Sequence, residues 1–316
     1  MTLLASLACT MGPTTREVIE ARVWTVERLQ LGDHVCVLVD GVDDGLEVIA
    51  QTVAAGLAAG DRVIVFTELV PPAQVLAGLE ARDILPGREG RAGQVQVVSA
   101  REAYLPAGRF EPARLMESLR DHVERATLDG YPGLRLVGDM AWALSAPPGV
   151  DQLAGYEAQV NHLYMDGRAL GVCVYDRRAF DGDLLQRISC AHPATRATAV
   201  GTGWAPLLRI RRTSDPYGLR LIGEADFSSG QAVAAAVEAL VDQQPDPPAP
   251  IHIDLAGLRF ADAATAALLT RLALRTPAGV HLFGCHGPVA RILDCLGATG
   301  LPAVRFSRAA GTELIA

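Results

Sequence analysis

Short apolar segments alternate with helical segments along most of this sequence, and this alternation constrains the fold more than any other feature. In the first two thirds of the chain, the predicted strands cover residues 33–39, 62–66, 94–99, 134–138 and 169–175. The predicted helices cover residues 46–59, 72–80, 112–127, 150–163 and 183–191. Strands joined through helices run parallel, because each crossover returns the chain to the same end of the sheet. The sequence therefore predicts a doubly wound, mostly parallel α/β sheet.

The pattern changes near residues 198–207, where Gly and Pro interrupt the periodicity. A second, smaller series follows, with predicted strands at 219–223, 251–255, 280–283 and 304–306 and predicted helices at 229–241, 263–274 and 288–296. The chain has 316 residues and is 50% hydrophobic, which is enough apolar material for two cores. We predict an N-terminal domain over 15–197, a linker over 198–207 and a C-terminal α/β domain over 208–316.

The sequence contains no lysine, so all 28 of its basic residues are arginine. This absence excludes a working Walker A phosphate loop, a protein kinase and a pyridoxal-phosphate enzyme, because each requires a Lys amine. The net charge of −8 argues against nucleic-acid binding, which needs a basic face. The sequence has no apolar run long enough to span a membrane and no basic start typical of a signal peptide. We therefore expect a cytoplasmic protein that binds neither membranes nor nucleic acid.

Segment 254–266, DLAGLRFADAATA, resembles the signature of STAS domains, the anti-sigma-factor antagonist fold. Residues 223–226, GEAD, match the end of an early strand in that family, and the resemblance covers about residues 208–312. It implies a STAS-like α/β fold and, as partner, an anti-sigma factor or a serine kinase of the HATPase type. The implied partner-binding face consists of Asp262, Ala263, Ala264 and Thr265.

In switching STAS domains the Ser directly after the second Asp of the motif is phosphorylated, and here that position is Ala263. A methyl group cannot accept a phosphate, so the usual switch, an added charge at a helix N-terminus, is absent from this position. Asp262 is expected to cap the helix. Ala263 then either starts a helix in a scaffold domain or belongs to a permanently unphosphorylated binding surface. Thr265 is a candidate surrogate acceptor.

Several separated motifs of the N-terminal region resemble the MEDS domain, a sensory domain named for methanogens, methylotrophs and a dichloromethane-response regulator. They are GDHVC at 32–36, YLPAGRF at 104–110, Tyr156-Glu157, CVYDRR at 173–178 and His192-Pro193. The resemblance spans about residues 15–195. It implies that the domain senses small molecules, with hydrocarbon derivatives among the candidates.

The same region resembles RecA/KaiC-like ATPases with a degenerate phosphate loop. A working loop would carry Gly-Lys-Ser/Thr at residues 45–47, where this chain has GLE. Asp43 and Asp44 beside it would repel a triphosphate. Glu68 and Asp139 fall at the positions of the catalytic Glu and the Walker B Asp in that superfamily. We expect neither ATP hydrolysis nor a bound cofactor.

In a doubly wound sheet, ligands bind at the carboxyl ends of the strands. The candidate ligand pocket at this rim consists of Asp40, Glu68, Arg101, Tyr104, Asp139, Tyr175 and Asp176. Tyr104 lies in a predicted loop that could close over the rim as a lid. In the alternative interpretation, each acid caps a helix or pairs with an Arg.

Two histidines and two cysteines form a separate candidate cluster of His34, Cys36, Cys173 and His192. His34 and Cys36 are two residues apart on a predicted strand, so both point to one face. Such a set could bind a metal or haem, or act as a redox-sensing thiol. It lacks the CxxC and HxxxH spacings typical of metal sites, and packing in the core explains it best. We therefore expect neither Zn²⁺ nor haem in the purified protein.

These features predict a non-enzymatic regulatory protein in which a small-molecule sensor domain controls an anti-sigma-antagonist-like domain. Two alternatives stay open. One is an enzyme of unknown type that uses the acidic crevice, although no triad of nucleophile and base is recognisable. The other is a small-molecule-binding scaffold that assembles through the STAS fold, which includes assembly as a homo-oligomer.

Overall fold

The computed structural model describes residues 28–85, 93–197, 208–244 and 247–308. The first domain is built on a sheet of six strands: β1 (His34–Val39), β2 (Arg62–Thr67), β3 (Val95–Ser99), β4 (Leu134–Asp139), β5 (Ala169–Asp176) and β6 (Ala194–Ala197). The order is β3-β2-β4-β5-β1-β6, and every neighbouring pair is parallel. The predicted parallel sheet is thus confirmed. The predicted linker at 198–207 and residues 15–27 of the predicted domain lie outside the described residues.

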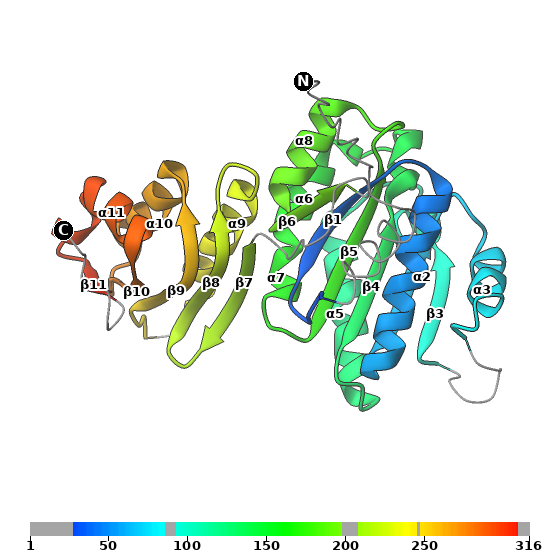
Figure 1. Ribbon diagram of the computed structural model, residues 1–316, viewed down its shortest axis with the longest axis horizontal. Helices are drawn as coiled ribbons and strands as arrows, with labels where there is room; N and C mark the ends of the chain where they lie inside the picture. Colours follow the sequence, from blue (N-terminus) through cyan, green and yellow to red (C-terminus); the bar gives the residue numbers. More distant parts are fainter. Residues whose placement is uncertain (1–27, 86–92, 198–207, 245–246, 309–316) are drawn as a thin grey trace, which may run out of the picture.

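Helices cover both faces of this sheet (Figure 1). They are α2 (Val42–Ala59), α3 (Pro72–Glu80), α4 (Ala100–Tyr104), α5 (Pro112–Leu128), α6 (Leu153–Gln159), α7 (Asn161–Tyr164) and α8 (Gly182–Ala191), with the 3-10 turns η1 (Met140–Ser145) and η2 (Val150–Gln152). Side chains alternate across a strand. Val35 and Val37 of β1 therefore belong to the core under α2 and α3, whereas Cys36 belongs to the core under α5, α6 and α8. Among the described residues, no helix combines the length and the apolar character needed to cross a membrane.

The helix predicted over 150–163 is broken. The structure has η2, then α6 ending at Gln159, and α7 beginning at Asn161. The Asn161 side chain donates to the backbone carbonyls of Glu157 and Ala158, at 3.1 and 2.9 Å. An Asn amide that bonds nearby carbonyls competes with the helical ladder, which accounts for the break.

The second domain is a five-stranded sheet in the order β11-β10-β9-β8-β7. Its elements are β7 (Leu208–Ser214), β8 (Tyr217–Ala225), α9 (Gly230–Asp242), β9 (Ile251–Ala261), α10 (Ala263–Arg275), β10 (Val280–Cys285), α11 (Gly287–Cys295), η3 (Ala298–Gly300) and β11 (Val304–Arg308). Strands β7 and β8 form an antiparallel hairpin, and the other pairs are parallel. One core cluster joins the sheet to its three helices. The predicted second α/β domain is confirmed, with β7 added at its edge.

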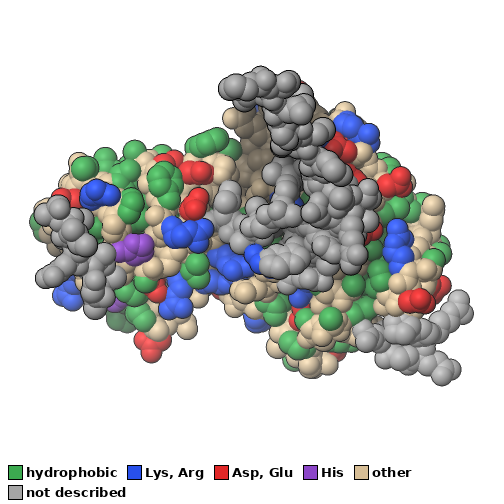
Figure 2. Space-filling view, viewed as in Figure 1, with side chains coloured by type: hydrophobic (Ala, Val, Ile, Leu, Met, Phe, Trp, Pro, Cys, Tyr) green, Lys and Arg blue, Asp and Glu red, His purple; other side chains and the backbone are tan. Residues whose placement is uncertain are grey.

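The two domains contact each other directly, with α9 of the second domain packed against α6, α7 and α8 of the first (Figure 1). Arginine side chains gather where the domains meet (Figure 2). The Asp33 carboxylate, 1% exposed, accepts hydrogen bonds from Arg209 Nε at 3.0 Å and Arg211 Nη2 at 2.7 Å. The Arg212 backbone N–H donates to the Met165 carbonyl at 2.9 Å. A buried carboxylate beside β1 therefore anchors the edge strand of the second domain.

Candidate functional site

The acids predicted to line the strand-end rim are engaged by neighbouring groups. Both carboxylate oxygens of Asp40 accept from Arg177, at 2.6 and 2.7 Å, and this pairing lowers the pKa of Asp40. Glu68 pairs with Arg101 at 2.7 Å. Asp176 likewise pairs with Arg178, at 3.3 Å. These contacts match the alternative interpretation in which the rim acids serve as ion-pair partners.

Asp139, which the sequence predicted at the Walker B position, has a structural role. Its carboxylate accepts from the backbone N–H groups of Glu68, Leu69 and Ala141, at 3.0, 2.9 and 3.0 Å. It therefore caps η1 and ties it to the end of β2.

Two residues of the predicted rim pocket lie in the core instead. Tyr104 ends helix α4 rather than lying in a loop; it is 5% exposed and stacks on Trp142 with ring centroids 5.0 Å apart. Tyr175 is fully buried, and its hydroxyl donates to Glu157 Oε1 at 2.5 Å. Both rings supply apolar area to the core. Tyr104 ends a helix instead of lying in the predicted lid loop, but it also lines the groove beside β3 that is described below.

The segment between β1 and α2, which the sequence predicted to be a degenerate phosphate loop, leaves little enclosed space beside it. The cavity there has a volume of about 30 Å³ and is lined by Gly41, Gly45, Thr67 and Asp139 among others. This volume accommodates about one water molecule. A triphosphate therefore does not fit inside this enclosed cavity.

A larger groove of about 370 Å³ lies beside the edge strand β3, between that strand, α4 and α5. Its apolar lining includes Phe66 and Leu115, and its polar lining includes Glu102, Arg114 and His122. Burial, followed by the charge of Arg125, lowers the pKa of His122. A groove of this size and mixed lining suits a small organic molecule. Of the predicted pocket residues, Tyr104 lines this groove. The groove itself was not predicted from the sequence, although polar residues at positions 114, 118 and 122 recur at helical spacing on α5.

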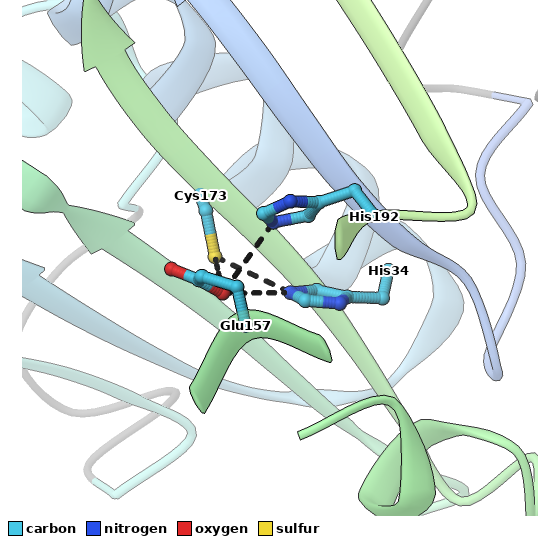
Figure 3. Close-up of side chains that lie close together, drawn as sticks. All are labelled: His34, Glu157, Cys173 and His192. Carbon is cyan, nitrogen blue, oxygen red and sulfur yellow. Dashed lines mark hydrogen bonds and ion pairs between the residues drawn. The ribbon is translucent and has the colours of Figure 1, made fainter. Parts of the chain in front are cut away.

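A second, fully enclosed site lies on the α5–α8 face of the sheet, where four side chains from separate elements converge (Figure 3). His34 begins β1, Cys173 lies on β5, Glu157 lies on α6, and His192 directly follows α8. One donor atom from each lies within 4.8 Å of all the others. None of the four residues is more than 8% exposed.

The short distances in this buried cluster all involve Glu157 or His34. Glu157 Oε2 lies 3.5 Å from the Nε2 atoms of both His34 and His192, and 3.7 Å from Cys173 Sγ. His34 Nε2 lies 3.4 Å from Cys173 Sγ. The structure thus brings together three members of the predicted His/Cys set and adds Glu157, which stood out in the sequence only as part of a family motif.

Hydrogen bonds on the outer side of each imidazole fix its orientation. His34 Nδ1 lies 2.9 Å from Asn161 Oδ1, and His192 Nδ1 lies 2.8 Å from the Ile188 carbonyl. Both partners are acceptors, so each Nδ1 carries a proton, and in the neutral form of each imidazole Nε2 presents a lone pair to the cluster. This tautomer is the one that metal ligation through Nε2 requires.

Burial and neighbouring charges shift the pKa values of His192, Glu157 and Cys173. Burial, helped by neighbouring His34, lowers the pKa of His192 to about 4. Burial opposes ionisation of Glu157, but His192 and His34 together hold its pKa below the usual value. Burial and Glu157 raise the pKa of Cys173 well above that of a free thiol. A protonated, enclosed thiol is not a reactive nucleophile, although Cys173, His34 and Asn161 line up in the order of a catalytic triad.

Cys36 does not belong to this donor set. Cys36 is fully buried and lies two residues after His34 on β1. Its register partner on the neighbouring strand β5 is Cys173. Burial raises the pKa of its thiol. The prediction that grouped Cys36 with the other three is therefore corrected, because sharing a face with His34 does not bring its sulfur to the same point.

The residues predicted to form the partner face lie at the start of α10. Asp262 Oδ1 accepts from the Thr265 backbone N–H at 2.7 Å, which makes Asp262 the cap of α10 as predicted. Ala263 and Ala264 are exposed in the first turn. Thr265 is only 3% exposed and faces the core, so it belongs neither to the exposed face nor to the accessible phosphate acceptors.

The fold and the buried cluster define a two-domain α/β protein with an enclosed polar site in its first domain. The chain belongs to the MEDS family, whose model, the methanogen/methylotroph, DcmR sensory domain, matches residues 33–193. A second model, described as Mlab, STAS domain, matches residues 208–303. Both resemblances found in the sequence are therefore confirmed.

Two known proteins are similar to parts of the chain. The transcriptional repressor DcmR of Methylorubrum extorquens is 28% identical over 149 residues, which cover 47% of this chain and 53% of DcmR. The match thus spans about half the length of that relative. The flagellar accessory protein FlaH of Methanocaldococcus jannaschii aligns with a TM-score of 0.42 and 10% identity, over 67% of this chain and 86% of FlaH.

Proposed function

We propose that this chain is a non-enzymatic signalling protein whose MEDS domain binds a small molecule and whose STAS domain binds an anti-sigma factor or a related serine kinase. The order of the two domains supports the regulatory role. The degenerate loop, which lacks Lys and has a cavity of about 30 Å³, supports a role other than ATP hydrolysis.

The observation that carries the proposal is the exposed apolar start of α10. Ala263 and Ala264 project there beside Phe260, which is 44% exposed, and near Phe227, which is 73% exposed. The backbone N–H of Asp262 donates to the Ala225 carbonyl, so these residues share one end of the sheet. A cluster of exposed aromatic and small apolar side chains is typical of a protein interaction surface.

The groove beside β3 is the proposed small-molecule site. Its apolar wall fits a hydrocarbon body, while Arg114 and His122 could bind a polar or anionic substituent. A signal from this domain would reach the second domain through α6, α7 and α8, which pack on α9. Regulation of this kind needs a coupling free energy of about 1–3 kcal/mol between ligand binding in the first domain and partner binding by the second.

The test is binding of the full chain to a panel of purified serine kinases of the HATPase type, measured by calorimetry. The substitution Ala264→Asp places charge in the first turn of α10, where it suits the helix dipole but not an apolar interface. We expect it to weaken binding at least about tenfold, whereas Ala303→Asp, at an exposed alanine before β11, should leave binding unchanged. Equal affinity for both variants, or no binding to any kinase, would remove the support for this partner class.

A further inference from the structure

In place of the core-packing interpretation and the zinc-free protein expected from the sequence, we propose that His34, Glu157, Cys173 and His192 bind one Zn²⁺ ion in a closed, four-coordinate site. These four residues form the buried cluster of Figure 3, which is separate from the groove beside β3 and from the proposed partner face of the STAS domain. Within the described part of the chain, these four are the residues whose donor atoms converge in this way.

The distances between the donor atoms match a tetrahedral zinc site. Bonds of about 2.0–2.3 Å to nitrogen, oxygen and sulfur require donor atoms about 3.3–3.8 Å apart. The measured separations are 3.4 Å from His34 Nε2 to Cys173 Sγ, 3.5 Å from each histidine Nε2 to Glu157 Oε2, and 3.7 Å from Glu157 Oε2 to Cys173 Sγ. Four edges of the tetrahedron are therefore already in place.

The chemistry of the donor set favours zinc over hard cations. Two imidazole nitrogens, one sulfur and one carboxylate oxygen suit a borderline-soft ion, whereas Mg²⁺ and Ca²⁺ prefer six or more oxygens. On binding, the Cys173 thiol proton leaves to the buffer and the sulfur coordinates as thiolate. The thiolate and the Glu157 carboxylate then carry two negative charges that neutralise the ion, so the buried site has no net charge.

The surroundings hold the donors as a metal site requires. Asn161 and the Ile188 carbonyl orient the two imidazoles from outside, and Tyr175 occupies Glu157 Oε1, which leaves Oε2 for the ion. His192 Nε2 is buried and has no hydrogen-bond partner. An unpaired buried nitrogen aimed at three other donors is costly unless a ligand binds it.

The position of the site suggests what the ion does. It would join β1 and β5 of the sheet to α6 and to the residue that ends α8, and α6 and α8 both pack on α9 of the STAS domain. His34 also directly follows Asp33, which binds Arg209 and Arg211 of the second domain. With four protein ligands and no exposed face, the ion would fix structure across the domain interface rather than activate water.

The experiment uses the full chain, expressed with added zinc, dialysed against metal-free buffer and analysed by mass spectrometry for metals. We expect about one zinc per chain in the wild-type protein. In Cys173→Ser and in His192→Gln the zinc content should fall at least about tenfold. Cys36→Ser is the matched control, because Cys36 is equally buried on the neighbouring strand but lies outside the donor set, and it should keep its zinc.

A second readout does not depend on the folding of any variant. Wild-type protein stripped with a chelator and reloaded with Co²⁺ should show a sulfur-to-cobalt charge-transfer band, and added zinc should raise the melting temperature. Wild-type protein that neither retains nor takes up zinc would overturn the proposal. Stoichiometric iron, copper or haem in its place, or zinc lost equally from Cys36→Ser and Cys173→Ser, would overturn it as well.

Discussion

The Asp33 anchor offers the sharpest test of how the two domains are joined. Its buried carboxylate receives three charged hydrogen bonds, of 3.0 and 3.2 Å from Arg209 and 2.7 Å from Arg211. Such bonds contribute about 1.5–3 kcal/mol each when enclosed, and removing one partner of a buried pair costs about 3–5 kcal/mol. The two arginines are 20% and 19% exposed, and a side-chain amide in place of the carboxylate would retain one acceptor oxygen. We therefore expect Asp33→Asn to cost about 2–4 kcal/mol.

The assay combines urea unfolding with amide hydrogen exchange. The loss should be localised, so the amides of β7, α9 and α7 should exchange faster while those of β2 and β4 keep their protection. Asp129→Asn is the matched control, because Asp129 pairs with Arg62 at 2.9 Å but is 57% exposed. It should cost no more than about 0.5 kcal/mol. If the two variants lose equal stability, or if protection falls uniformly, Asp33 does not anchor the interface.

Local geometry leads to three further predictions. Gly171→Ala should cost about 1–3 kcal/mol in urea unfolding, because the added Cβ would meet the Tyr164 ring and lie 2.9 Å from His34 Cδ2; an unchanged midpoint would refute this. Calorimetry with ATP and Mg²⁺ at millimolar concentration should show no binding, since the loop cavity has about 30 Å³ and offers no Lys; micromolar affinity would contradict the assignment of a degenerate loop. Intact-mass analysis after incubation with ATP and a STAS-directed kinase should show no phosphate at α10, because Ala263 has no hydroxyl and Thr265 is buried; a phosphate on Thr265 would refute it.

The parallel sheet and most of its helices followed from the sequence because apolar periodicity reports burial directly. The edge strand β7 of the second sheet was harder to predict. Residues 208–214, LRIRRTS, contain only two apolar side chains, and the intervening arginines point to Asp33 of the other domain. Such a strand is specified by a tertiary ion pair rather than by its own pattern. The break in the helix near Val160 depends similarly on where the Asn161 amide finds its carbonyls.

The buried cluster shows a related limit. His34, Cys173 and His192 could be grouped from the sequence because each lies in, or directly after, an apolar element. Cys36 looked equivalent, yet a displacement of two residues along a strand moves its side chain about 6.6 Å. Glu157 lies on a helix, and its depth under the sheet depends on how α6 packs, which no local pattern reveals. Its place beside Tyr156 in a family motif was the available signal.

The adjacency of Asp33 and His34 connects the interface to the buried cluster. Backbone hydrogen bonds from Gly32 to the Ala169 carbonyl, at 2.6 Å, and from Gly171 to the Asp33 carbonyl, at 2.9 Å, hold this segment on β5. The side chains of neighbouring strand residues point to opposite faces, so one short segment presents a carboxylate to the second domain and an imidazole to the core. A change that shifts His34 must then strain either these two backbone bonds or the contacts of Asp33 with Arg209 and Arg211. The start of β1 therefore connects the buried cluster to the edge strand of the STAS domain through one peptide bond and the ion pairs of Asp33, and variants of His34 should alter hydrogen exchange in β7 more than variants of Cys36 do.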